Sequence, residues 1–223
     1  MIVAALRIAR KDLRSELRTK ESLNAALSLT IVLLLLFSFA FDPTSDETRQ
    51  WTGGLLWLVF SFAAALALNR AFARELTNDC LEALRASPVP ASALFLGKAL
   101  AGFTLLLGVE LIALPAYSVF YNVNLLAQPA MLLATLALAT WGMTVVGTMF
   151  SALTVNLHMR ELMLPVLVYP MLIPALVAAM RLTAVVVENR PLGEDMIWLR
   201  LLIAFDIIFT ALSLALAEVV LVD

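Results

Sequence analysis

Residues 69–98 of the chain read NRAFARELTNDCLEALRASPVPASALFLGK, a polar and charged stretch that lies between two long apolar runs. In its first part, apolar side chains recur at helical spacing, with charged residues on the other side of the helix. The apolar residues of this stripe are Leu76, Cys80, Leu81 and Leu84. Residues 87–90, Ser-Pro-Val-Pro, end any such helix, because proline lacks an amide donor and disfavours a helical residue before it. We therefore predict an amphipathic helix and a rigid turn between two membrane-crossing helices.

The composition indicates an integral membrane protein. Hydrophobic residues make up 62% of the 223 residues and charged residues only 14%, with a mean hydropathy of +0.96. Soluble domains are nearer half apolar and a quarter charged. One cysteine and one histidine exclude an intrachain disulfide and a metal site built from several of these residues. Ser92 stands where a P-loop ending in Gly97-Lys98 needs its first glycine, so the chain has no ATP-binding P-loop of its own.

Six apolar stretches are long enough, or nearly so, to cross a hydrocarbon core of about 30 Å at about 1.5 Å per residue. We place them near residues 22–41, 51–69, 94–117, 129–155, 162–180 and 198–221, with the polar segment 70–93 between the second and the third. Trp51 and Trp57 open the second span in the manner of interfacial anchors. Residues 1–223 are thus predicted to form one transmembrane domain, of the all-α integral membrane class.

Residues 1–21 are predicted to form an amphipathic helix that lies in the membrane interface. One helical stripe is apolar and consists of Ile2, Leu6, Ala9, Leu13 and Leu17. The neighbouring face is cationic and consists of Arg7, Arg10, Lys11, Arg14 and Arg18. Such a helix directs its cations toward water and anionic headgroups. The alternative interpretation is a charged segment that only leads into the first span.

The distribution of cations predicts the orientation. With a cytoplasmic N-terminus, 11 Lys and Arg residues lie on the cytoplasmic side, and four lie on the opposite side, namely Arg49, Arg181, Arg190 and Arg200. This bias follows the positive-inside rule and places both termini and the 70–93 segment in the cytoplasm. There the segment can contact a soluble partner as a coupling helix; an ordinary solvated helix is the alternative. The predicted contact residues are Arg74, Glu75, Asp79, Leu81, Glu82, Leu84, Arg85, Ser87, Pro88, Pro90 and Lys98.

Two carboxylates lie within predicted spans, Glu110 in the third and Asp206 in the sixth. A charge in lipid is costly, so both are expected to face the bundle interior, a partner helix or a water-filled path. A structural hydrogen bond and a transport role both stay open for them. His158 and Cys80 are interpreted as ordinary packing or solvated residues, and no catalytic or metal-binding residue is predicted. Residues 181–197 are either a short outer helix or re-entrant cap, or a plain loop.

Several of these positions resemble the CcmB family. Arg70, Phe72, the Leu81-Glu82-x-Leu84 and Ser87-Pro88-x-Pro90 groups and Lys98 stand in the order seen in that family. The basic N-terminus, Glu110 with Pro115 in the third span, and Pro165, Pro170 and Pro174 in the fifth span are similar as well. Asn69 and Asp79 depart from the family pattern, which has an acidic residue and commonly a glycine at these places.

The resemblance implies the permease subunit of the ABC-type haem exporter of bacterial cytochrome c maturation, located in the inner membrane. It implies a CcmA-like ATPase that binds ATP and Mg²⁺ and docks on the cytoplasmic segment. It also implies CcmC-like and CcmD-like membrane subunits and a CcmE-like haem chaperone downstream. The chain itself is then not an enzyme and holds no cofactor, with haem as the candidate cargo. A second copy of the chain is expected, because one copy has too few helices to enclose a path.

Two other functions remain open from the sequence. The first is an ABC-type exporter permease for another cargo, such as a lipid, a drug or a polysaccharide. The second is a membrane scaffold that the ATPase remodels without any substrate crossing, in which Glu110 and Asp206 would serve as helix–helix contacts.

Overall fold

The computed structural model describes residues 1–41, 46–69, 89–154 and 160–222. Within these ranges the chain is helical and has no strand. The long helices are α1 (Ile2–Thr19), α2 (Glu21–Ala40), α3 (Asp46–Asn69), α6 (Ala91–Phe120), α7 (Pro129–Leu153), α8 (Arg160–Val187) and α9 (Met196–Val222), and the short 3-10 turns are η2 (Leu125–Ala127) and η3 (Gly193–Asp195). In the described part, six helices are long and apolar enough to cross a membrane. The predicted all-α membrane class is confirmed.

The helix ends differ from the predicted spans mainly at α6 and α8. α6 begins at Ala91, directly after Pro90, whose extended backbone (ψ 138°) precedes the first helical turn. α8 continues to Val187, where the prediction ended the span at 180, because its last turns still bury apolar side chains such as Val185 and Val186. Segment 181–197 is therefore neither the separate short helix nor the long loop that the sequence left open. It is the end of α8 followed by a short turn into α9.

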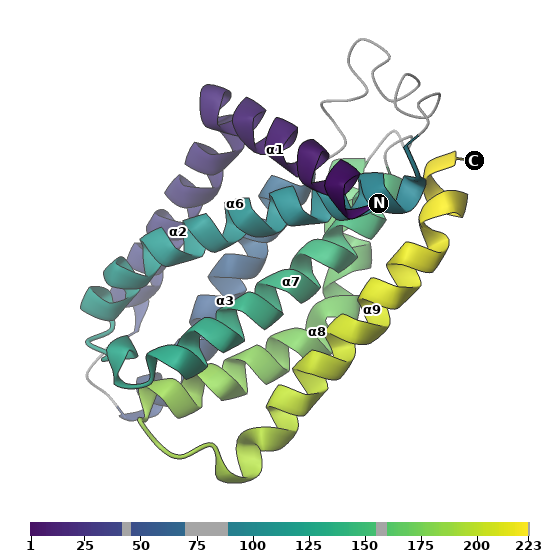
Figure 1. The fold of residues 1–223 in the computed structure, drawn as a ribbon. Helices are drawn as coiled ribbons and strands as arrows, with labels where there is room; N and C mark the ends of the chain where they lie inside the picture. The colour runs from purple at the N-terminus through teal and green to yellow at the C-terminus, as the bar shows by residue number, and fades with distance from the viewer. Residues whose placement is uncertain (42–45, 70–88, 155–159, 223) are drawn as a thin grey trace.

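The six candidate membrane-crossing helices form one bundle, and α1 lies at one end of it, against the first turns of α6 (Figure 1). Both termini lie at this same end (Figure 1). The arrangement agrees with an even number of crossings, as the six predicted spans require. We call this the terminal end of the bundle and the opposite one the far end.

α7 lies at the centre of the bundle and contacts α3, α6, α8 and α9. Its small residues permit close approach: a Cβ added at Gly147 would overlap Cδ1 of Leu68, on α3. The hydroxyl of Ser151 donates a hydrogen bond of 3.1 Å to the carbonyl oxygen of Leu68. A Cβ at Gly102 of α6 would also lie 3.1 Å from the Leu68 side chain. Leu68 thus fills the space between two glycines on neighbouring helices, which is how helices pack closely in a membrane.

The prediction that Trp57 is an interfacial anchor is wrong, whereas the same interpretation of Trp51 stays a prediction. Trp51 is exposed, but Trp57 is fully buried in the contact between α3 and α8. Its indole N–H donates a hydrogen bond of 2.8 Å to the hydroxyl of Thr183. The close approach of the two helices at Gly53, where a Cβ would lie 3.0 Å from the Met180 carbonyl oxygen, brings this donor and acceptor together. A buried indole needs such a partner.

α1 contacts α6 through a glycine. A Cβ added at Gly97 would lie 2.7 Å from Cβ of Ile8 and 2.8 Å from the carbonyl oxygen of Ala5. Both distances are shorter than a real Cβ contact permits, and one involves backbone, which cannot swing aside. Gly97 therefore sets how closely α1 lies on α6.

We predict that Gly97→Ala destabilises the protein by about 1–3 kcal/mol, the usual cost of overpacking a close contact. The matched control is Gly108→Ala on the same helix, where an added Cβ meets nothing within 4 Å. Alanine is the better helix former, so this control should keep or raise the unfolding temperature. Thermal unfolding of both variants in detergent measures the difference, and equal unfolding temperatures would show that α1 does not depend on this contact.

Candidate functional site

A buried cation joins α1 and α6 next to Gly97. Lys98 is only 4% exposed, and its Nζ lies 3.3 Å from Oδ2 of Asp12 on α1. The other carboxylate oxygen of Asp12 lies 3.1 Å from Nζ of Lys11. An ion pair with a buried member is costly to break from one side, because the remaining charge loses its partner. In this structure, Lys98 acts between two helices of the same chain, and contact with a soluble partner stays a prediction.

The turn from α1 to α2 is held by a second acidic residue of α1. Lys20 adopts a left-handed backbone conformation with φ of 55°, which ends α1 and starts α2. Glu16 is buried, and its Oε1 accepts a hydrogen bond of 2.9 Å from the backbone N–H of Leu23. That amide belongs to the first turn of α2, where no carbonyl of the helix is available to it. Glu16 thereby determines the direction in which α2 leaves α1.

α1 presents three faces. The face toward the protein carries Ala5, Ile8, Ala9, Asp12 and Glu16. A second face is apolar and exposed, and carries Ile2, Leu6 and Leu17. The third face is cationic and exposed, and carries Arg7, Arg10, Lys11, Arg14 and Arg18. An amphipathic helix is present in the predicted region 1–21, over Ile2–Thr19. Ala9, however, is buried against the protein and does not lie on the exposed apolar stripe.

Glu110 lies inside the bundle, as predicted, and has a partner. It is 2% exposed, and its Oε2 accepts a hydrogen bond of 2.6 Å from the hydroxyl of Thr140 on α7. The pair links α6 to α7 in the middle of the membrane-crossing region. A buried hydrogen bond between helices stabilises their packing, because either group alone would lack a partner in lipid.

Asp206 also lies inside, but its two carboxylate oxygens are buried without a hydrogen-bond partner in the described part of the chain. It is 6% exposed, and a Cβ at Gly142 of α7 would lie 2.8 Å from its Oδ1. Thr140 and Gly142 are two residues apart on α7, so they point roughly 200° apart around the helix axis. Glu110 and Asp206 therefore meet opposite sides of α7 and do not form one site.

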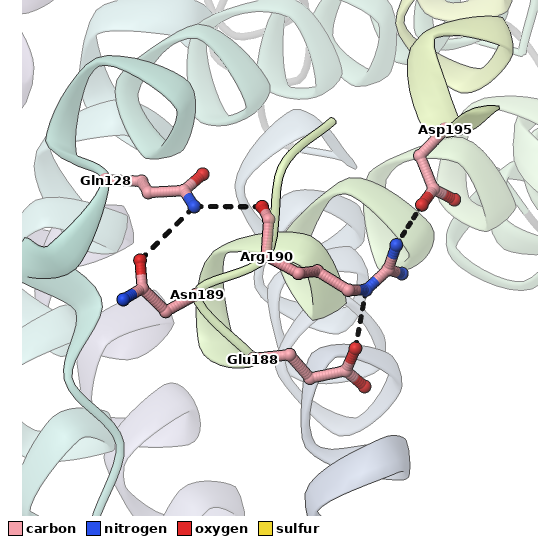
Figure 2. A network of polar contacts seen from close by, with 5 residues as sticks. All are labelled: Gln128, Glu188, Asn189, Arg190 and Asp195. Carbon is pink, nitrogen blue, oxygen red and sulfur yellow. Dashed lines mark hydrogen bonds and ion pairs between the residues drawn. The ribbon is translucent and has the colours of Figure 1, made fainter. Parts of the chain in front are cut away.

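The far end carries a polar network between the α6–α7 and α8–α9 connections, drawn in Figure 2. The amide of Gln128 donates to Oδ1 of Asn189 at 3.3 Å and to the carbonyl oxygen of Arg190 at 2.9 Å. The Arg190 guanidinium pairs with Glu188 at 2.6 Å and with Asp195. The hydrogen bonds that the Arg190 guanidinium donates to Asp195 and, second, to Glu188 raise the pKa of Arg190. This network ties the starts of α7 and α9 to the end of α8.

Most residues predicted to contact a soluble partner lie outside the described residues. These are Arg74, Glu75, Asp79, Leu81, Glu82, Leu84, Arg85, Ser87 and Pro88. The predicted coupling helix is thus neither confirmed nor contradicted, and Cys80 and His158 lie outside the described residues as well. Pro90 is exposed and directly precedes α6. Among the residues that the structure describes, no group of three or more His, Cys, Asp or Glu side chains could hold a metal ion.

Comparison with known proteins places this bundle in a family. The profile of the CcmB protein family matches residues 3–222. The chain belongs to the CcmB family. The protein called heme exporter protein B of Rhodobacter capsulatus is 32% identical over 170 residues, which cover 75% of this chain and 76% of that protein. Its namesake in Pseudomonas aeruginosa is 28% identical over 96% of this chain and 95% of its own length. The Escherichia coli protein of the same name is 27% identical, over 78% of each chain.

Membership in the CcmB family and the six apolar helices establish a multi-pass membrane protein. The sequence indicated that the two carboxylates within spans, Glu110 and Asp206, are buried, but it did not indicate which residues surround them. Nothing local to Thr140 marks it as the partner of Glu110, which is 30 positions away. A signal in the sequence could have identified Asp12 and Glu16 as candidates for contacts within the protein, because they are the only acidic residues in the otherwise cationic sequence of α1.

We predict that Thr140→Val lowers the free energy of unfolding by about 1–3 kcal/mol, because it leaves the Glu110 carboxylate buried without its donor. The matched control is Thr135→Val on the same helix. Its hydroxyl only bonds the carbonyl oxygen of Met131 in its own helix, at 2.9 Å. The control should therefore lose less stability, as measured by thermal unfolding in detergent. Equal losses would show that the link from Thr140 to Glu110 does not hold α6 and α7 together.

Proposed function

We propose that the chain is the permease subunit of an ABC-type complex that exports haem, or releases it to its chaperone, in cytochrome c biogenesis. The observation that carries the proposal is the CcmB family match over residues 3–222, together with relatives called heme exporter protein B. In this proposal the membrane is the bacterial inner membrane, and both termini are cytoplasmic. Two copies of the chain pair with two copies of an ATPase, and CcmC-like and CcmD-like subunits and a CcmE-like chaperone complete the system.

The missing P-loop supports an external ATPase of the CcmA type. The sequence has Ser92 in place of the first P-loop glycine, so ATP and Mg²⁺ belong to the partner. The partner is proposed to dock on the cytoplasmic segment between α3 and α6. The chain binds no cofactor in this scheme. Haem passes through the membrane subunit as cargo if the complex exports it, and does not if the complex only releases haem to the chaperone.

The contacts of α6 could transmit a movement of the docking segment to the helices in the membrane. Pro90 fixes the start of α6, and within its second turn Gly97 and Lys98 contact α1. α6 then reaches α7 through Glu110 and Thr140. A displacement of the first turn of α6 would therefore be passed both to α1 at the interface and to the centre of the bundle. This is the coupling that ATP binding by the partner would use.

The alternatives are an ABC permease for another cargo and a scaffold without transport. The hydrogen bond from Thr140 favours a structural role for Glu110. Asp206 favours neither role, because its carboxylate oxygens have no hydrogen-bond partner in the described part of the chain. The name of the relatives favours haem over another cargo. The cargo is tested by whether haem absorbance co-purifies with the complex, and by whether the chain restores c-type cytochromes in bacteria that lack their own CcmB subunit. If the chain reaches normal levels in the membrane of these bacteria but c-type cytochromes do not form, the proposed function is wrong.

The docking proposal is tested by charge reversal. The double variant Glu75→Lys and Glu82→Lys should reduce co-purification of the ATPase several-fold, because an acidic contact surface becomes basic. The control Glu194→Lys reverses one exposed charge in η3, at the far end. It should leave the amount of co-purified ATPase unchanged. If the double variant co-purifies a normal amount of the ATPase, this segment is not the site at which the ATPase docks.

A transport role for the carboxylates is tested separately. We predict that Glu110→Gln with Asp206→Asn keeps cytochrome c maturation close to normal if both groups are structural, since the amides keep the shape and the acceptor oxygens. Cytochrome c content, measured from haem-stained gels, gives the result. A strong loss of maturation with unchanged amounts of the chain in the membrane would assign the carboxylates to the transport path.

A further inference from the structure

We propose that a hollow on the cationic face of α1 binds the phosphate group of an anionic phospholipid. Arg7, Arg10, Lys11 and Arg14 line an open hollow on the protein surface. All four residues are exposed. This site is independent of the cargo and of the ATPase, so it stands apart from the proposed function.

The charge of the hollow fits a phosphate. Lys11 is 3.1 Å from Asp12 and is partly neutralised by it, which leaves the three arginines as the main positive groups. Guanidinium groups bind phosphate oxygens through two parallel hydrogen bonds, which makes arginine the preferred residue for this ligand. The spacing of these arginines by three and four positions keeps them on one side of the helix.

The structure prevents α1 from turning about its axis. Ala5 and Ile8 of α1 pack closely against Gly97 of α6. Asp12, on the same side of α1, forms an ion pair with Lys98 of α6. With this side fixed, the exposed apolar side chains Leu6 and Leu17 lie on the adjoining face, roughly 60° on average from the arginines around the helix axis. A helix placed in this way buries its apolar face among acyl chains and holds its cations at the level of the headgroups.

The apolar side chains beside the hollow favour a lipid over a soluble anion as its ligand. Leu6 is 56% exposed and Leu17 is 61% exposed, and α1 leads directly into the apolar helix α2 through Lys20. The hollow therefore lies beside a surface that itself requires acyl chains. An anionic phospholipid supplies both the acyl chains and the phosphate, whereas free phosphate or an acidic protein supplies only the charge.

The test measures lipid retention by the full-length chain. The purified protein in detergent is incubated with phosphatidylglycerol or, for comparison, zwitterionic phosphatidylcholine, and bound lipid is counted by native mass spectrometry. The variant Arg10→Gln with Arg14→Gln removes two cations of the hollow. The matched control, Arg18→Gln with Arg200→Gln, removes two exposed cations that do not line it.

We expect the protein to prefer phosphatidylglycerol, and the hollow variant to bind it about 25-fold more weakly, at about fivefold per cation near an anionic surface. The control should lose clearly less affinity than the hollow variant, because neither Arg18 nor Arg200 lines the hollow. If the double variant does not purify as a monodisperse protein, the single variants Arg10→Gln and Arg14→Gln should each lose about fivefold.

Three results would contradict the proposed lipid-binding site. Equal losses in the hollow variant and the control would show a diffuse charge effect. Displacement of the lipid by inorganic phosphate at equal concentration would show a site for soluble anions. Loss of a co-purifying acidic protein from the hollow variant, with unchanged lipid retention, would show that the hollow is a protein contact.

Discussion

Close packing around α7 is the interaction on which the rest of the bundle depends. Lipid tails are as apolar as the side chains they would replace, so helices associate in a membrane only where they fit tightly. Gly142 and Gly147 let α9 and α3 approach α7. The hydroxyl of Ser151 adds a hydrogen bond at the contact with α3, and that of Thr140 adds one at the contact with α6. Of the six candidate spans in the described part of the chain, α2 and α9 are the least buried, so their outward faces are available to lipid or to other subunits.

The spans were predictable because the length and apolarity of a run decide whether it crosses a bilayer. The same rule misplaced the end of α8, since Arg181 interrupts the apolar run although the helix continues. Its guanidinium lies 5.9 Å from the ring of Trp198 on α9, which gives the charge a partner. Trp57 was misplaced for a related reason. Tryptophan is common at interfaces, and only the contact with Thr183 reveals that this one is buried.

The candidate site was predictable in its residue types but not in its pairs. A carboxylate within an apolar run signals burial at once, which is how Glu110 and Asp206 were found. Lys98 and Asp12 are 86 positions apart, and no local pattern connects them. The periodicity of α1 distinguished its apolar and cationic faces. It did not reveal which face meets the protein, because that depends on the missing side chain of Gly97 on another helix.

The length of α6 gives the junction with α1 a further consequence. Its 30 residues extend about 45 Å, whereas the hydrocarbon core is about 30 Å thick. An apolar stretch that is longer than the core is accommodated by a tilt or kink of the helix or by a thicker bilayer around it. Here the excess lies where Ala5 and Ile8 of α1 cover Gly97, so protein rather than lipid surrounds part of the extra length. The chain thereby limits its own hydrophobic mismatch, and α1 helps to set the depth of the bundle in the membrane.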